Sequence, residues 1–309
     1  SWIGSAVTLN WDNLGGTLTI SRPLVMGIVN VTPDSFSDGG AYVSVESARD
    51  AALRMVADGA DMLDVGGEST RPGAKPVAAD EQIRRVAPVI RALRDAGCGV
   101  PISVDTTSAE VAAESLRAGA VIVNDVSAAE DDPEMLGVVA RAGAGLILMH
   151  RAQKPAQDRY SDRYQQPPIA GDVVSVANAF LARRLEAAVA SGVPRDRVAL
   201  DPGLGFGKTV EQNLELIRRG DELASLGRPV VSGISRKSFA GRVGLGRDSE
   251  PGERVWSSVG LAVAHSMRGA HVHRVHDVRP HAEALRAAWG VFGFGMAGRA
   301  SEAGRGGEA

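Results

Sequence analysis

Acidic and amide side chains recur at or near the ends of short apolar runs in the sequence. They are Asn30, Asp64, Asp105, Asn124 and Asp201. Their oxygens accept hydrogen bonds, and a carboxylate can also stabilise positive charge that develops on a ligand. Asp105, Asn124 and Asp201 around one opening would suit a ligand with several N–H donors, such as an aminopyrimidinone ring.

Basic side chains occupy other positions of the same kind. They are Arg71, Lys237, Arg274 and His276. Cations in these positions would bind an anionic group such as phosphate. Ser235-Arg236-Lys237-Ser238 directly follows an apolar run, where the N-terminus of a short helix could donate further N–H groups to an anion. Arg236 fits such a site or a solvated surface about equally.

Two further patterns are weaker. Gly203–Thr209 resembles a phosphate-binding loop, but Pro202 stands where a Walker A motif requires glycine. We therefore expect these glycines to shape a loop beneath a ligand. His271 and His273 alternate out of phase with His276, so we expect them to face helices or solvent and not to form a metal cluster with it.

The elements that must position these side chains alternate between β-rich runs and segments of helical period. Eight runs are predicted as strands: Leu24–Asn30, Asp61–Gly66, Val100–Asp105, Ala120–Asp125, Gly145–Met149, Arg197–Asp201, Arg228–Gly233 and Ala270–His276. Apolar residues between them recur at helical spacing, as in Ala48, Ala51, Ala52 and Met55. Successive β-α units of this number predict an α/β fold of the (β/α)8, or TIM, barrel type.

An open, doubly wound sheet shares this alternation and is the alternative fold. Eight units without a break in composition favour the closed barrel. In a barrel the carboxyl ends of the strands meet at one mouth, and alternation along each strand decides which side chains point inward. The polar residues predicted to point inward are Asn30, Asp64, Asp105, Asn124, Arg274 and His276.

A purely structural role is the alternative for each strand-end Asp or Asn, because these residues often cap the following helix. Other residues are predicted to supply the caps. Thr107–Glu110 and Thr209–Gln212 have the capping-box pattern, and Asp132-Pro133 fits an N-cap followed by proline. Asp105, Asn124 and Asp201 are thus expected to be available for a ligand.

Additional segments surround the barrel, which is assigned to residues 23–290. Residues 1–22 are predicted to cap its bottom as a β-hairpin, with Val7–Trp11 and Thr17–Ser21 joined by a turn at residues 12–16. Residues 291–309 are expected to be a disordered tail. The long polar loop at residues 151–170 carries Tyr160 and Tyr164 and is expected to act as a lid or rim.

Composition excludes several classes of protein. The chain has 309 residues, of which 44% are hydrophobic and 23% charged, which excludes a disordered chain. A net charge of -3 argues against nucleic-acid or membrane partners. The lone Cys98 cannot form an intramolecular disulfide, and the sequence shows neither a signal peptide nor an apolar run of about 18 residues. We expect a cytoplasmic protein.

Long motifs of the chain resemble those of the dihydropteroate synthase family. Met26–Gly40 reads MGIVNVTPDSFSDGG and Asp64–Gly73 reads DVGGESTRPG, and each is similar to a signature of that family. Further matches follow in the family's order: Ser103–Thr106, Asn124-Asp125, Asp201–Gly203, Ser235–Phe239 and Arg274–Val278. The resemblance extends from about Pro23 to Gly290 and implies a (β/α)8 barrel that is usually a homodimer.

The resemblance implies a role for each motif residue. A pterin pocket would comprise Asp64, Asp105, Asn124, Met149, Asp201, Phe206, Gly233, Lys237 and Arg274. The Mg2+ ligand would be Asn30, and pyrophosphate would contact Asn30, Thr70, Arg274 and His276. The loops Val31–Gly40 and Gly67–Gly73 would close over p-aminobenzoate, which would contact Phe36, Thr70, Arg71, Pro72, Ser235 and Lys237. The catalytic residues would be Asp105, Lys237 and Arg71.

The implied reaction is attack by the amine of p-aminobenzoate on the methylene of 6-hydroxymethyl-7,8-dihydropterin pyrophosphate, in folate synthesis. In this family the bond to pyrophosphate ionises before attack. Mg2+, Arg274 and His276 would stabilise the departing anion, and Asp105 the cationic pterin. Sulfonamides mimic p-aminobenzoate and are the expected inhibitors. The chain departs from the family pattern at Arg151–Pro155, where a Gly-containing stretch is usual.

Two other functions are alternatives. A methyltetrahydrofolate–corrinoid methyltransferase holds a pterin in a similar barrel, but it is not expected to carry the Asn30–Gly40 and Ser235–Phe239 motifs. An inactive pterin-binding paralogue would tend to lose its loop motifs, which are complete in this sequence.

Overall fold

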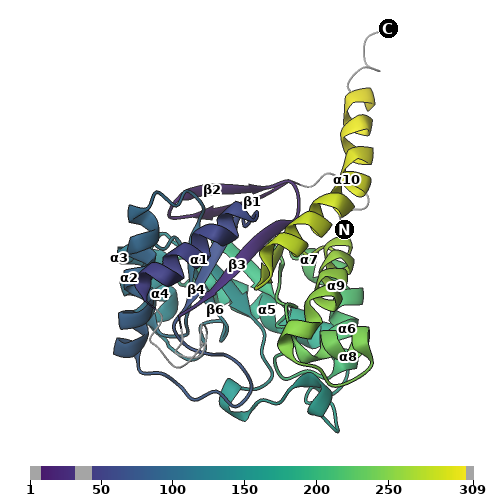
Figure 1. Cartoon of the computed structure of the whole chain (residues 1–309), viewed down its shortest axis with the longest axis horizontal. Helices are drawn as coiled ribbons and strands as arrows, with labels where there is room; N and C mark the ends of the chain where they lie inside the picture. Colours follow the sequence, from purple (N-terminus) through teal and green to yellow (C-terminus); the bar gives the residue numbers. More distant parts are fainter. Residues whose placement is uncertain (1–7, 32–43, 304–309) are drawn as a thin grey trace.

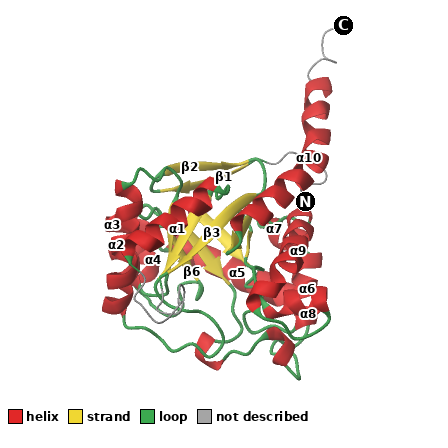
Figure 2. Ribbon diagram, viewed as in Figure 1, coloured by secondary structure: helices red, strands yellow, loops and turns green. Residues whose placement is uncertain are grey.

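The protein, as a computed structural model, is described for residues 8–31 and 44–303. Its centre is a parallel sheet of eight strands surrounded by helices (Figures 1 and 2). The strands are β3 (Leu24–Asn30), β4 (Met62–Gly66), β5 (Ile102–Asp105), β6 (Ile122–Asp125), β7 (Gly145–Met149), β8 (Val198–Asp201), β9 (Val231–Ser232) and β10 (Val272–Val275). The eight predicted strands are confirmed, most of them slightly shortened.

The sheet closes almost completely into a barrel. Its strand order is β8-β7-β6-β5-β4-β3-β10-β9. A single bridge between Leu200 and Val230 joins the two end strands. β9 pairs with β10 at only two positions, Val231 and Ser232, so the seam lies between β8 and β9. The predicted barrel is confirmed, and the doubly wound alternative is wrong.

Helices pack their apolar stripes on the outer face of this barrel. They are α1 (Val45–Ala57), α2 (Ala79–Asp95), α3 (Ala109–Ala118), α4 (Met135–Ala142), α5 (Val173–Ala190), α6 (Val210–Arg218), α7 (Gly220–Ala224), α8 (Ser238–Leu245), α9 (Val255–Met267) and α10 (Val278–Ala303). Short 3-10 helices are η1 (Pro155–Gln157), η2 (Ser161–Arg163), η3 (Arg195–Arg197) and η4 (Pro251–Arg254). None of the helices in the described residues could span a membrane, given their length and polarity.

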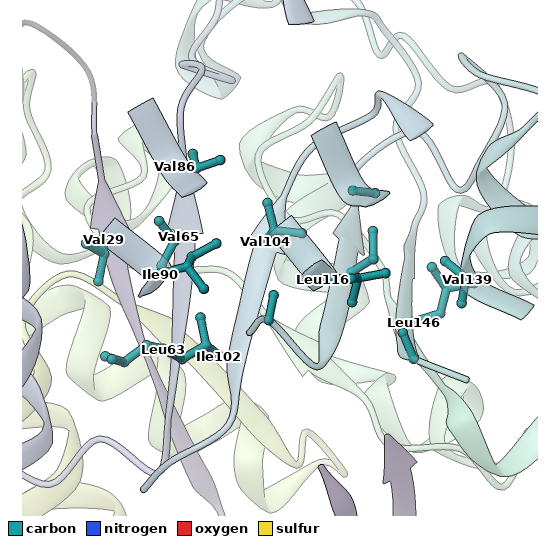
Figure 3. Close-up of a cluster of buried hydrophobic side chains, with 14 of the residues drawn as sticks. Val29, Leu63, Val65, Val86, Ile90, Ile102, Val104, Leu116, Val139 and Leu146 are labelled. Atoms are coloured by element: carbon teal, nitrogen blue, oxygen red, sulfur yellow. The ribbon is translucent and has the colours of Figure 1, made fainter. Parts of the chain in front are cut away.

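The packing of α2 shows why the helical spacing predicts this arrangement. Val86, Ile90 and Leu93 recur one turn apart and are fully buried. They face the outward-pointing residues of β4 and β5, such as Val65 and Val104 (Figure 3). Alternation along the strands therefore places apolar side chains under the helices and leaves the intervening residues to point into the barrel.

The hairpin of β1 (Leu9–Asn13) and β2 (Gly16–Ile20) closes the bottom of the barrel. Its turn is the two residues Leu14 and Gly15, shorter than the predicted turn at residues 12–16, because the strands pair up to Asn13 and Gly16. Trp11 is fully buried in a cluster with Met26, Met62 and Ile147 from the barrel interior. Its indole Nε1 donates a hydrogen bond to the carbonyl of Arg197 at 2.9 Å.

Two of the three predicted helix caps differ from the structure. Thr209 caps α6 in a complete capping box with Gln212, as predicted. The cap of α3 is Ser108 and not Thr107, because the Ser108 hydroxyl accepts the Val111 N–H. α4 begins only at Met135, because residues 132–135 form a tight turn first. Asp132 instead accepts the Ala109 N–H at the start of α3, at 2.8 Å.

The C-terminal segment also differs from its prediction. Residues 291–303, expected to belong to a disordered tail, continue α10 (Figure 1). No proline follows Pro280 in the sequence, so no residue beyond it lacks the N–H that continues a helix. The remaining tail, residues 304–309, lies outside the described residues.

Three buried histidines lie beside β10. His271 and His273 are buried on its helix side, which decides between the two predicted environments in favour of helices. His265 on α9 pairs through Nδ1 with the Ser232 hydroxyl at 2.8 Å. Burial lowers the pKa of His265 to about 3 and of His271 to about 4, and holds the pKa of His273 well below its usual 6.5. These side chains therefore stay neutral in the folded protein at physiological pH.

Replacing Trp11 with alanine should lower the free energy of unfolding by roughly 3–5 kcal/mol, because it leaves a large cavity at the bottom of the barrel. Urea unfolding followed by circular dichroism measures this change. Leu14→Ala is the matched control, since Leu14 lies in the same hairpin and is 49% exposed. Equal destabilisation by both substitutions would contradict the capping role of Trp11.

Replacing His273 with glutamine should make stability less sensitive to acid. Below the usual pKa of 6.5 the unfolded chain binds a proton at His273 and the folded protein does not, so stability falls as the pH drops. One such histidine contributes a slope of about 1.4 kcal/mol per pH unit. Urea unfolding of both proteins between about pH 5 and pH 8 measures the slopes, and parallel slopes would contradict the prediction.

Candidate active site

A cavity of about 730 Å3 opens at the carboxyl ends of the barrel strands. It is lined by almost all of the predicted site residues that the structure describes: Asn30, Thr70, Arg71, Pro72, Asp105, Asn124, Met149, Asp201, Phe206, Gly233, Ser235, Lys237, Arg274 and His276. Asp64 lies beneath its floor. Phe36 and residues 32–40 of the first predicted loop lie outside the described residues.

Asp64 is fully buried and organises the floor of the cavity. Its carboxylate accepts hydrogen bonds from the Ser103 hydroxyl, from Asn124 Nδ2 at 3.0 Å and from Arg274 Nε at 2.6 Å. These contacts join β4, β5, β6 and β10, because inward-pointing residues of neighbouring strands lie at similar heights. Asp64 therefore fixes the amide of Asn124 and the guanidinium of Arg274 in the cavity.

The two carboxylates nearer the mouth lie in low-dielectric surroundings. Asp105 accepts a hydrogen bond from Arg274 Nη2 at 2.6 Å. Burial raises the pKa of the Asp105 carboxyl above its usual 3.8, although the charge of Arg274 opposes this. Burial likewise raises the pKa of Asp201 to about 6.

Asp201 also has a structural role that the sequence analysis assigned to other residues. Its Oδ1 accepts the N–H of Gly203 at 2.6 Å, which fixes the turn after β8. The carboxylate keeps further lone pairs for a ligand.

Lys237 and Phe206 form one side of the cavity. The Lys237 ammonium lies 3.9 Å from the centre of the Phe206 ring, within cation–π distance. Burial lowers the pKa of Lys237 to about 8. Phe206 packs with Met149 and Val126 in a small apolar cluster, so the cavity combines an apolar wall with acceptors on its floor.

Arg236 has neither of the roles that the sequence left open. Its guanidinium forms two hydrogen bonds with the Asp277 carboxylate, at 2.9 and 2.7 Å, and ties the loop after β9 to the loop after β10. The two loops meet again where the Ser235 hydroxyl accepts the backbone N–H of His276 at 3.1 Å. These contacts place Ser235, Lys237 and His276 together at the mouth.

Glu68 holds the loop at residues 67–73 and was not singled out from the sequence. Its carboxylate accepts hydrogen bonds from the Val77 N–H at 2.8 Å and from Gln82 Nε2 at 3.2 Å. The N–H of Gly73 donates to the carbonyl of Pro155 at 2.8 Å, so the divergent segment 151–155 touches this loop. Farther along, residues 160–163 line the cavity, which fits the expected rim.

Lys208 was also missed, and it fixes the glycine-rich loop after β8. It is fully buried, and its Nζ donates to the carbonyls of His150, Gly203 and Phe206 at 3.2, 2.8 and 3.0 Å. Gly203 adopts a φ of +67°, and a Cβ there would lie 1.8 Å from the His150 carbonyl oxygen. A lysine at the end of the glycine run was the available signal.

The residues at the mouth fit a magnesium ion that arrives with a phosphate ligand. Asn30 ends β3 with a half-buried side chain and lines the cavity together with Arg274 and His276. No cluster of three or more His, Cys, Asp or Glu suited to a metal occurs within residues 8–31 and 44–303. Mg2+ often takes only one or two protein oxygens and completes its shell with water and phosphate, and the Asn30 amide oxygen can serve in this way.

Substituting Lys208 with methionine should lower the free energy of unfolding by roughly 3–5 kcal/mol, because three buried carbonyls lose their donor. Chemical denaturation measures the change. Lys154→Met is the control, since Lys154 is 64% exposed, and its effect should stay within about 0.5 kcal/mol. A Lys208→Met protein as stable as the control would show that the ammonium does not hold the loop.

Comparison with known proteins bears on the resemblance seen in the motifs. The pterin binding enzyme family matches residues 26–276 of the chain. Dihydropteroate synthase of Synechocystis sp. is 43% identical over 267 residues, which is 86% of this chain and 89% of the relative. The Escherichia coli K12 enzyme is 40% identical over 272 residues, which is 88% of this chain and 93% of the relative.

Solved structures agree with these relatives. Dihydropteroate synthase of Xanthomonas albilineans with 4-aminobenzoic acid has a TM-score of 0.83 and 42% identity, covering 92% of this chain and 98% of its own. The Yersinia pestis enzyme with a sulfonamide drug has a TM-score of 0.83 and 40% identity, covering 92% of this chain and 99% of its own. The chain therefore belongs to the pterin binding enzyme family and, within it, to the dihydropteroate synthases.

Proposed function

We propose that this protein condenses 6-hydroxymethyl-7,8-dihydropterin pyrophosphate with p-aminobenzoate to give 7,8-dihydropteroate and pyrophosphate. The observation that carries the proposal is one cavity with buried acceptors on its floor and cations at its mouth. A related Xanthomonas albilineans structure, 40% identical with a TM-score of 0.79, holds 7,8-dihydropteroate. Complete motifs at Ser235–Phe239 and Asp64–Gly73 favour this enzyme over the methyltransferase and the inactive paralogue.

The pterin ring would bind at the bottom of the cavity. Asp105 and Asp201 would accept its N–H groups, while the Asn124 amide and Lys237 would pair with its acceptor atoms. Met149 and Phe206 would contact the ring faces, with Gly233 leaving space beside them. Polar groups in this buried site need partners, so a ligand that lacks matching donors would bind poorly.

The pyrophosphate would lie at the mouth among Asn30, Thr70, Arg274 and His276. Bound Mg2+ would help neutralise the charge that collects on the leaving group. Arg274 would do the same with a guanidinium that stays charged at any working pH. Burial lowers the pKa of His276 to about 3, so its imidazole would act on the pyrophosphate as a neutral hydrogen-bond partner.

The reaction would proceed by breaking the C–O bond first, with its electron pair leaving on pyrophosphate. The buried charge of Asp105 would stabilise the cationic methylene that remains. The amine lone pair of p-aminobenzoate would then form the C–N bond, and the extra amine proton would pass to solvent. Thr70, Arg71, Pro72, Ser235 and Lys237 would hold the aryl amine, together with Phe36.

Two partner assignments accompany this function. Sulfonamides would compete with p-aminobenzoate, and the related Yersinia pestis structure in complex with a sulfonamide drug supports this. A homodimer is proposed from the family resemblance. Trp256 on α9 is 76% exposed, and Val243 and Leu245 on the adjoining α8 are 44% and 38% exposed, which would suit a surface covered by a second copy.

Replacing Asp105 with asparagine should lower turnover roughly 100-fold, because the side chain keeps its shape but no longer carries a negative charge. A coupled assay measures dihydropteroate by mass and pyrophosphate by its release. Asp12→Asn, in the hairpin at the opposite end of the barrel, should leave both products unchanged. Omission of magnesium should abolish both products for the wild type. Full turnover by the Asp105→Asn protein would reject the site assignment.

A further inference from the structure

Arg274 occupies the pterin pocket in this structure and does not extend toward the mouth. Its Nε lies 2.6 Å from Asp64 Oδ2 and its Nη2 lies 2.6 Å from Asp105 Oδ2. The side chains of Arg274, Asp64 and Asp105 are 19%, 0% and 7% exposed. Without a ligand, one guanidinium therefore neutralises two carboxylates that face the pocket.

This arrangement competes with a pterin ring. Asp105 is the carboxylate expected to accept pterin N–H groups, and its Oδ2 is already bonded to Arg274. Asp64 cannot release Arg274 to a neutral ring without leaving a buried cation unpaired, which is costly in a low-dielectric interior. A pterin that brings no negative charge would therefore have to displace Arg274 without offering it a new partner.

A pyrophosphate group offers that partner. Arg274 lies two residues before His276, and β10 pairs with β3, the strand that ends in Asn30. Asn30, Arg274 and His276 all line the same cavity. An anion bound at the mouth can thus attract the guanidinium from its carboxylates and leave Asp105 free for the ring.

We propose that Arg274 makes pterin binding depend on pyrophosphate, and so selects the activated pyrophosphate ester over the unactivated pterin alcohol. This inference rests on the function proposed above. Its thermodynamic form is a positive coupling between two ligands at adjacent subsites, carried by one side chain that has two alternative partners. The coupling is reciprocal, so the pterin must strengthen pyrophosphate binding by the same factor.

The alternative is that the Asp64–Arg274–Asp105 contacts are only structural. A carboxylate has about four lone-pair sites, so Asp105 could accept a pterin N–H while it remains bonded to Arg274. In that case the ring and the anion would bind independently. The two explanations therefore differ in a measurable quantity, the change in pterin affinity when pyrophosphate is present.

The test uses the full chain and two separate ligands, 6-hydroxymethyl-7,8-dihydropterin and inorganic pyrophosphate, at constant magnesium. Isothermal titration calorimetry gives the Kd of the dihydropterin without pyrophosphate and with saturating pyrophosphate. We expect pyrophosphate to tighten dihydropterin binding by roughly tenfold in the wild type. Arg274→Gln removes the coupling, so its two Kd values should agree within about twofold.

Arg22→Gln is the matched control variant. Arg22 forms the same kind of two-bond pair, with Asp61, at the amino ends of β3 and β4, and its substitution should leave the coupling intact. Equal dihydropterin affinity with and without pyrophosphate in the wild type, or tenfold tightening that persists in Arg274→Gln, would overturn the inference alone. No dihydropterin binding under either condition would overturn the proposed function as well. The wild-type comparison decides the matter even if Arg274→Gln fails to fold.

Discussion

Charge burial inside the barrel is the constraint on which the site depends. Asp64 is fully buried and contributes a carboxylate to a space that the strands enclose on all sides. Arg274 and the Asn124 amide supply its partners from strands distant in sequence. Because an unpaired charge there would be strongly unfavourable, barrel closure and the organisation of the pocket are linked.

The loops above the pocket are held by polar contacts to backbone groups and not by apolar packing alone. Lys208 binds three carbonyls of the β7 and β8 loops, Glu68 binds the N–H of Val77, and Arg236 is paired with Asp277. These residues have no predicted contact with a substrate. They place Phe206, the Arg71 loop and Lys237 respectively, which is how a barrel with adaptable loops can still present a defined surface.

Much of the fold could be predicted because its causes are local. Alternation along each strand depends on backbone geometry alone, so inward positions such as Asn124 and Arg274 followed from counting residues. Family-like motifs gave the remaining site residues. Boundaries were predicted less well: Ser108 rather than Thr107 caps α3, because the capping hydroxyl must reach the N–H three residues on.

What the sequence determined by itself is the set of side chains that face the mouth and the order of the β-α units. Tertiary structure alone decided which partner each charge takes. Arg236 pairs with Asp277 although 41 positions separate them, and Arg274 reaches Asp64 across 210 positions. Such pairings depend on how strands close into a barrel and on which buried charges then lack water, and neither is encoded in local spacing.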